Sequence, residues 1–205
     1  MAIWLRRSED ISGVIHHSDH GVQCWPSAGP SAWLRHYAAG YAVDEIEPPA
    51  IAEAAEVWAN VLIPEVRAMW PMMLSIISDD ANRVMGLVFD ANPEVDVAGH
   101  MQAMMARQSL ARKWAEFQLG HPLILAPVCT EPPFAVGTDL TPEGVAGIVR
   151  SMRMVVAVDL LGLPAATVPV GMAEGLPQEV QVIGPRYRED LCLDAAEPWR
   201  WPSGL

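Results

Sequence analysis

Basic residues are scarce in this sequence of 205 residues, and lysine is almost absent. Lysine and arginine together number 13 against 25 acidic residues, which gives a formal net charge of -12, and Lys113 is the single lysine. Non-specific binding to nucleic acids depends on clustered basic side chains that neutralise phosphates. The charge balance therefore argues against a nucleic-acid partner.

Cysteine is the second scarcity. Cys24, Cys129 and Cys192 are an odd number and lack the spacing of a disulfide framework. This usage favours a reducing compartment, and we expect a cytoplasmic protein. The first ten residues, "MAIWLRRSED", contain two arginines with no apolar segment behind them, so we do not expect a secretory signal there.

A long uninterrupted apolar run is also lacking. The most apolar stretch, Met154–Met172, carries one charge, Asp159, and is interrupted by Pro164 and Pro169. These prolines would break a membrane-spanning helix, and the carboxylate would lie uncompensated in hydrocarbon. We therefore predict a buried helix followed by a buried strand, and no membrane partner.

The residues from Ala38 onward alternate between helical and extended patterns. Strands are expected at Tyr41–Ile46 and over 122–128, and a strand pair at 164–170 and 178–184, joined by a turn over 171–177. Helices are expected over 50–70 with a kink at Pro64, over 95–120, from Pro142 to about Leu161, and from Tyr187 onward. Strands and helices in this order predict an α/β fold with helices packed on a sheet.

Several phrases of the sequence are specific when taken together. They are "AAGYAVDEIEPP", "HPLILAPV", "DLLGLPAATVPVG" and "GLPQEVQVIGPRYREDLCLDAAE". From Ala38 to Glu197 they resemble the C-terminal part of the amidase signature family. The resemblance implies a partial α/β/α layered fold with a mixed sheet, a small-molecule amide as substrate, hydrolysis of carboxylic amide bonds, and no cofactor or metal.

Members of that family use a serine nucleophile activated by a second serine and a lysine, within a segment rich in glycine and serine. Such chemistry needs a deprotonated lysine as the ultimate base and backbone N–H groups for the oxyanion. This sequence has no Ser-Ser pair, no Gly-Gly pair and no lysine before Lys113. No catalytic residue is therefore assigned, and we expect a truncated amidase that is inactive alone. The alternative is a non-catalytic scaffold or interaction subunit, which completes its sheet with a partner chain that supplies the missing half.

The resemblance divides the sequence into three parts. Residues 1–37 are an unmatched segment, expected to be disordered or foreign; residues 38–197 are the C-terminal part of an amidase-like domain; residues 198–205 are an unmatched tail. Five of the eight tryptophans lie in the two unmatched parts, which supports the hypothesis that both are out-of-frame or foreign translation. Within the match, Asp159 replaces the usual Asn, and Glu179 replaces the usual Gly before Val-Gln.

Three further groups of polar residues have the chemistry of possible sites. The cluster of His16, His17, His20 and Cys24 has zinc-ligand chemistry but not the spacing of a structural zinc site, so an unstructured tail is favoured. Ser109 and Lys113 lie four residues apart on a predicted helix, where an exposed face is favoured over a Ser–Lys dyad. Ser78 and the acidic residues after it are interpreted as a helix cap or turn.

Two groups of apolar residues are interpreted as parts of the core, and one loop is interpreted as a ligand site. Cys129 and the cluster Met101, Met104 and Met105 are interpreted as core residues. The exception is the loop "CTEPPFAVGTDL", which follows a strand end, where α/β folds place ligand contacts. The resemblance places this loop beside the substrate pocket, and Phe134 is the predicted substrate-binding wall.

Overall fold

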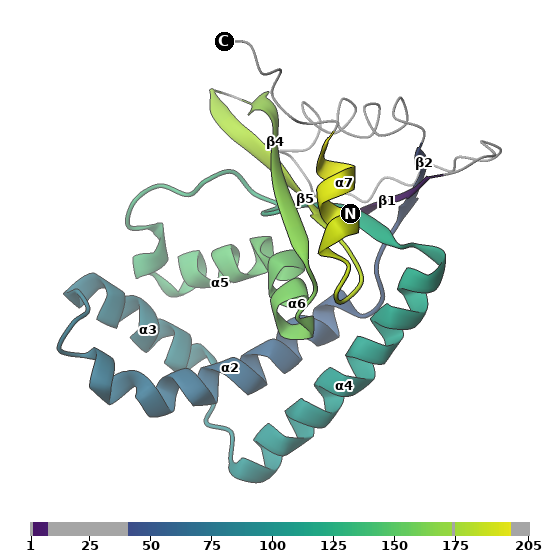
Figure 1. Cartoon of the computed structure of the whole chain (residues 1–205). Coiled ribbons are helices and arrows are strands. Elements are labelled where there is room, and N and C mark those ends of the chain that lie inside the picture. Colours follow the sequence, from purple (N-terminus) through teal and green to yellow (C-terminus); the bar gives the residue numbers. More distant parts are fainter. Residues whose placement is uncertain (1, 8–40, 174, 198–205) are drawn as a thin grey trace.

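The computed structural model describes residues 2–7, 41–173 and 175–197. Its elements are the strands β1 (Ala2–Arg7), β2 (Tyr41–Ile46), β3 (Leu123–Pro127), β4 (Ala165–Ala173) and β5 (Leu176–Ile183), the short 3-10 helix η1 (Thr138–Leu140), and the helices α2 (Ile51–Met73), α3 (Asp79–Ala91), α4 (Val97–Gly120), α5 (Pro142–Ser151), α6 (Arg153–Leu161) and α7 (Glu189–Ala196). Figure 1 shows the sheet beside a layer of long helices.

The five strands form one sheet in the order β2-β1-β3-β5-β4. Every pairing between these described strands is antiparallel, so the expectation of a mixed sheet is wrong for this part of the chain. The reason is local: β4 and β5 are joined by a tight connection, and such a connection can only join antiparallel neighbours. The connection is shorter than the predicted turn over 171–177, because β4 continues to Ala173 and β5 begins at Leu176.

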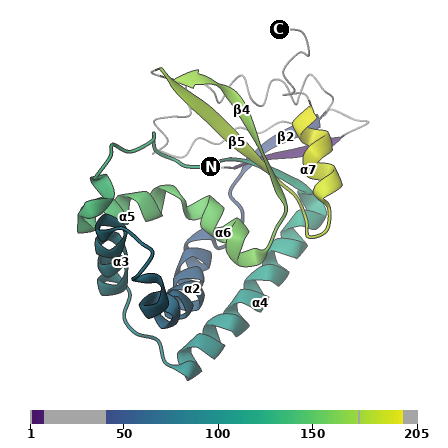
Figure 2. The ribbon, with the colours of Figure 1, turned by 60° about the vertical axis from the view of Figure 1, so that its left-hand side comes forward.

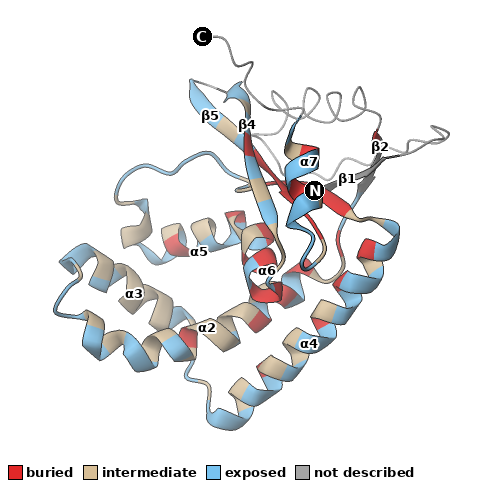
Figure 3. Ribbon diagram, in the orientation of Figure 1, coloured by how far each residue is buried: buried red, intermediate tan, exposed pale blue. Residues whose placement is uncertain are grey.

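Alternation along the strands gives the sheet two buried faces. Ile124, Ala126 and Ile183 belong to a core shared with α2, α4 and α6. Leu125 and Val182 belong to a second core with Cys192 and Ala195 of α7. Helices therefore cover both faces of the sheet (Figures 1 and 3), and the predicted α/β class with α/β/α layering is confirmed.

Helices α2 and α4 pack against each other in opposite directions, as Figure 2 shows from the side. At one end, the fully buried Trp114 donates its indole N–H to the carbonyl of Pro49, 2.8 Å away. Farther along the pair, His100 Nε2 lies 3.7 Å from a carboxylate oxygen of Glu65. Helix α2 continues through Pro64, where the sequence predicts a kink.

The buried helix predicted to run to Leu161 is two helices. Helix α5 ends at Ser151 and α6 begins at Arg153, with Met152 between them at φ −94° and ψ 6°. Helix α6 then ends where the sequence predicts, at Gly162, in the left-handed conformation that glycine adopts without steric cost. The Nε of Arg107 donates to the Leu160 carbonyl and that of Arg186 to the Leu161 carbonyl, so two cations lie at the negative end of α6.

The start of the chain differs from the sequence-based expectation. Ala2–Arg7, within the segment expected to be disordered or foreign, form β1 between β2 and β3. A strand here has no sequence signal of its own, because the partners that define it are more than 30 residues away. The remainder of that segment and the tail over 198–205 lie outside the described residues.

The interpretation of the methionine cluster as core filling is wrong. Met101 and Met105 are 62% and 64% exposed, and the buried residues of α4 are Ala103, Leu110, Trp114 and Gln118. The first half of α4 extends past the sheet (Figure 3), so the described chain has no layer to cover these side chains there. Among the described helices, none is long and apolar enough to cross a membrane.

Candidate functional site

A cavity of about 380 Å³ opens at the end of β3, within the loop that the sequence singles out. Phe134, 54% exposed, lines it together with residues from two other segments. We call it the Phe134 cavity; its wall consists of Val128, Cys129, Glu131, Pro132, Pro133, Phe134, Ile148, Ser151, Met152, Pro177, Gln178 and Glu179.

Hydrogen bonds hold the cavity loop to the helix behind it. The backbone N–H of Thr130 donates to the carbonyl of Ser151 at 2.9 Å, and the Ser151 hydroxyl donates to the Ile148 carbonyl at 2.8 Å. The buried Gln181 of β5 donates its amide to the Pro127 carbonyl at 3.1 Å. The cavity wall is thus attached to the rigid sheet at one side and to α5 at the other.

The described wall of the Phe134 cavity is apolar with acidic groups, and none of its residues is a cation. Its carboxylates are Glu131 and Glu179, and its aromatic group is Phe134. This composition suits an uncharged ligand with an apolar body, since a carboxylate-bearing ligand would be repelled by the two glutamates.

Cys129 lies in this wall, so its interpretation as a core residue is wrong. It is exposed, whereas Cys192 is buried against the sheet with its sulfur 3.5 Å from the Pro164 carbonyl. Partial burial raises the pKa of the Cys129 thiol, and burial, partly opposed by a hydrogen bond with the Gly184 backbone, raises the pKa of Cys192 to about 11. Both are thiols at neutral pH, and Cys129 is the accessible one of the two.

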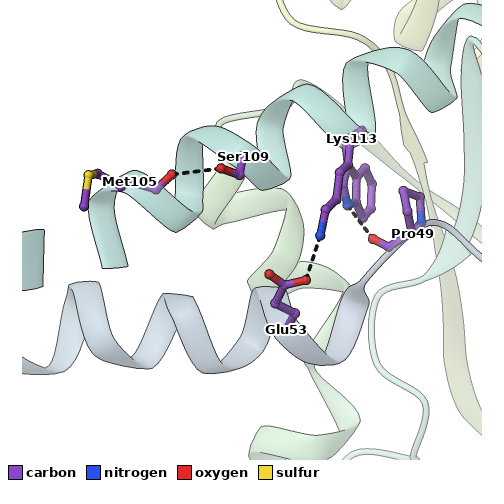
Figure 4. A network of polar contacts seen from close by, with 6 residues as sticks. Pro49, Glu53, Met105, Ser109 and Lys113 are labelled. Carbon is purple, nitrogen blue, oxygen red and sulfur yellow. Dashed lines mark hydrogen bonds and ion pairs between the residues drawn. The ribbon is translucent and has the colours of Figure 1, made fainter. Parts of the chain in front are cut away.

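Ser109 and Lys113 do not form a dyad. The Ser109 hydroxyl donates to the Met105 carbonyl at 3.4 Å, whereas the Lys113 ammonium donates to Glu53 of α2 at 3.0 Å (Figure 4). Both residues are exposed, and the Lys113 ion pair is half-exposed on both sides. The prediction of an exposed helix face is therefore confirmed, and the partner of Lys113 is Glu53 and not Ser109.

The other candidates have definite outcomes where the structure describes them. Ser78 caps α3, since its hydroxyl accepts the N–H of Ala81 at 3.2 Å. The zinc-type cluster at His16, His17, His20 and Cys24 lies outside the described residues. Over 2–7, 41–173 and 175–197, no three His, Cys, Asp or Glu side chains are gathered as metal ligands would be.

Comparison with known proteins assigns the chain to a family. The family model described as Amidase matches residues 35–193, more than three quarters of the sequence. The chain belongs to the amidase family. The matched range agrees within a few residues with the resemblance from Ala38 to Glu197.

Three similar proteins illustrate the relationship. Indoleacetamide hydrolase of Bradyrhizobium diazoefficiens is 37% identical over 161 residues, which cover 77% of this chain and 30% of that protein. The structure of Kluyveromyces lactis allophanate hydrolase matches with a TM-score of 0.72 and 18% identity, over 91% of this chain and 31% of that one. A bacterial aryl acylamidase of the amidase signature family matches with a TM-score of 0.63 and 19% identity, over 85% and 40%.

This amidase-family chain therefore spans less than half the length of each of these three proteins.

The structure shows the contacts of the two residues, Asp159 and Glu179, that differ from the usual residues of the family. Asp159 accepts the indole N–H of Trp58 at 2.7 Å, which joins α6 to α2, and Glu179 lies in the Phe134 cavity.

Sequence reasoning found the cavity loop of this amidase-family chain but missed the other half of the wall. Ile148, Met152 and the segment Pro177–Glu179 carry no local signal of a site. Ile148 and Met152 lie at the end of α5, to which the cavity loop is hydrogen-bonded. Pro177–Glu179 reach the cavity because Val180 of β5 pairs with Pro127 of β3, which brings the start of one strand to the end of the other. A predicted strand pair with its register could have found this segment.

Proposed function

We propose that this chain forms the C-terminal part of a hydrolase that cleaves carboxylic amides to an acid and ammonia or an amine, and that the Phe134 cavity holds the apolar part of the substrate. The match of the family model to residues 35–193 carries the proposal. The apolar wall and the similarity to an indoleacetamide hydrolase together favour an uncharged aromatic amide as substrate. The protein works in the cytoplasm as a soluble enzyme.

We further propose that the chain is inactive alone. Amide hydrolysis in this family needs a nucleophilic serine with a second serine and a lysine, and the single lysine here is paired with Glu53. The 205 residues contain no Ser-Ser pair. The catalytic groups then come from a segment that precedes the matched region in longer relatives.

A chimeric enzyme tests the proposal. Residues 35–193 would replace the aligned region of the Bradyrhizobium indoleacetamide hydrolase, and ammonia release from indole-3-acetamide would be measured for the chimera and for the 205-residue chain alone. We expect hydrolysis by the chimera and none by the chain. Hydrolysis by the chain alone would refute its inactivity, and a folded but inactive chimera would refute the proposed contribution to catalysis.

Variants of the chimera test the role of the cavity. Phe134→Ala should raise KM about tenfold, because it removes an aromatic contact with the apolar part of the substrate. Val136→Ala is the matched control: it lies in the same loop, is fully exposed and does not line the cavity. Equal KM values for the two variants would place the substrate elsewhere.

Cys129 provides a readout of occupancy that does not depend on turnover. Alkylation of Cys129 by iodoacetamide, followed by peptide mass spectrometry, should slow when indole-3-acetamide fills the cavity. The buried Cys192 is the internal reference, since it should stay unlabelled until the protein unfolds. An unchanged Cys129 rate at saturating amide would count against the assignment of the cavity.

The alternative is a scaffold or interaction subunit that pairs with a separate chain, and the sheet supports it. Strand β4 lies at the end of the sheet order, and Ala165, Thr167 and Pro169 along it are exposed. An uncovered edge offers backbone groups to another strand. Mixing the chain with the separately produced N-terminal part of the relative tests this: co-elution with recovered hydrolysis supports complementation, and co-elution without hydrolysis supports a scaffold.

A further inference from the structure

A second cavity lies at the opposite end of the sheet from the Phe134 cavity. Ile124 of β3 pairs with Ile183 of β5 at that end, and the second half of α4, the end of α6 and the residues after β5 line the space. Its volume is about 370 Å³, within the range of small-molecule sites. We call it the Gln118 cavity; its lining is Ala111, Ala115, Gln118, Leu119, Leu161, Leu163, Pro185 and Arg186.

The lining of the Gln118 cavity is apolar except for two hydrogen-bond donors. Among the described residues that line it, Arg186 is the one charged residue and none is a carboxylate. The described lining of the Phe134 cavity is the reverse, with two carboxylates and no cation. The two cavities therefore select ligands of different charge.

Gln118 is the unusual residue of this cavity. It is 5% exposed, and its buried amide nitrogen has no hydrogen-bond partner. A buried donor without a partner is destabilising, and natural proteins contain few of them. A ligand that brings an oxygen acceptor into the cavity would satisfy this donor.

Arg186 supplies the positive charge and is held in place by the fold. Its Nε and Nη2 both donate to the Leu161 carbonyl at the end of α6, and Nη1 takes part in neither bond. A guanidinium fixed in this way loses little side-chain entropy when it binds a carboxylate.

We propose that the Gln118 cavity is a binding site for a small apolar monocarboxylate, distinct from the proposed amide site. The carboxylate accepts from Arg186 Nη1 and from the Gln118 amide, and the hydrocarbon body packs on Ala111, Leu119 and Leu163. The volume fits a chain or ring of about eight carbons, since a 150 Å³ apolar cavity already holds benzene.

Octanoate is the probe, and the 205-residue chain is the protein. Titration followed by NMR of the ¹⁵N-labelled chain should show saturable shifts of the Gln118 side-chain amide and of Arg186 Nε. Octylammonium and 1-octanol, which match its length without its negative charge, should bind at least tenfold more weakly. Equal binding of octanol, or no saturation with octanoate, would overturn the proposal.

Gln118→Met separates a ligand site from a merely structural residue. The substitution removes the unpartnered donor, so the free chain should gain thermal stability while octanoate binding weakens about fivefold. Gln102→Met, at an exposed position of the same helix that lines neither cavity, is the control and should leave octanoate binding unchanged. A Gln118→Met chain that binds octanoate as tightly as the original would contradict the assignment.

Two further variants test the cation and the space. Arg186→Gln should weaken octanoate binding about tenfold, although it also removes bonds to the end of α6. Ala115→Phe is therefore included, because Ala115 is exposed and a ring there fills the cavity without disturbing the core; it should abolish binding. Gln108→Phe, exposed on the same helix outside the cavity, should not. Full binding by Ala115→Phe would place the ligand elsewhere, and each result is independent of amide hydrolysis.

Discussion

Single residues of this chain show how closely the sheet and α7 approach each other. Gly184 directly follows β5, and a Cβ atom added there would lie 2.7 Å from the sulfur of Cys192 and 3.2 Å from the Arg188 carbonyl. Both neighbours belong to the segment that folds back over the sheet. The glycine therefore permits the close approach on which the second core depends.

We predict that Gly184→Ala destabilises the chain by about 1–3 kcal/mol, the usual cost of overpacking a core. Urea denaturation measures the effect through the unfolding midpoint. Gly86→Ala is the matched control, since nothing lies within 4 Å of an added Cβ in α3. That substitution should stabilise by up to ~1 kcal/mol through helix propensity.

The second substitution Cys192→Ala tests the cause. If contact with the sulfur is responsible, Gly184→Ala should cost less in the Cys192→Ala background than in the original chain. Equal costs in the two backgrounds would assign the effect to the Arg188 carbonyl or to the turn itself.

At the scale of the element, the hydrogen bond that caps the start of a helix contributes to the free energy of unfolding by an amount that substitution can measure. Thr141 precedes α5, and its hydroxyl accepts the N–H of Gly144 at 3.1 Å. We predict that Thr141→Ala lowers the free energy of unfolding by about 1 kcal/mol, the typical cost of a lost N-cap. Thr141→Ser keeps the oxygen and should retain most of the stability in the same urea titration. Equal losses for both variants would show that the methyl group, not the cap, matters.

Elements with strong local signals were predictable, and those defined by distant partners were not. The strands Tyr41–Ile46 and Leu123–Pro127, the helix Val97–Gly120 and the end of α6 at Gly162 follow their sequence patterns closely. The break at Met152 was missed, because the residues around it are apolar and continue the helical pattern.

The errors in the candidate site have a related cause. The loop with Phe134 was found from its proline-rich sequence after a strand, but Cys129 was expected inside the core, because apolar context was equated with burial. The loop instead turns that residue to the cavity. Likewise the methionines of α4 satisfy a helical period, yet a period does not say whether a partner layer exists to cover it.

At the scale of the whole molecule, the part of the chain that the structure describes leaves apolar surface of its helices exposed. Large apolar side chains are exposed on α2, on the residues after it and on α4; these are Met69, Met72, Leu74, Ile76, Val97, Met101 and Met105. The amidase-family relatives are more than twice as long, and we expect the rest of their fold to cover such surface. The isolated chain should therefore bind the dye ANS and associate with itself.

The double substitution of Met101→Gln and Met105→Gln tests this expectation, because its effect on the free energy of unfolding should differ between the isolated chain and the chimera. In the isolated chain both side chains are exposed, so ANS fluorescence and self-association should fall while the urea midpoint stays within experimental error. In the chimera, where the remaining fold should bury them, the same change should cost several kcal/mol, because two apolar groups are replaced by amides. Leu110→Ala, at a fully buried position of the same helix, is the reference and should cost about 2–5 kcal/mol in both settings. A neutral effect in the chimera would mean that Met101 and Met105 stay exposed to solvent in the complete fold as well. Their exposure in this chain would then not result from the lack of a covering layer.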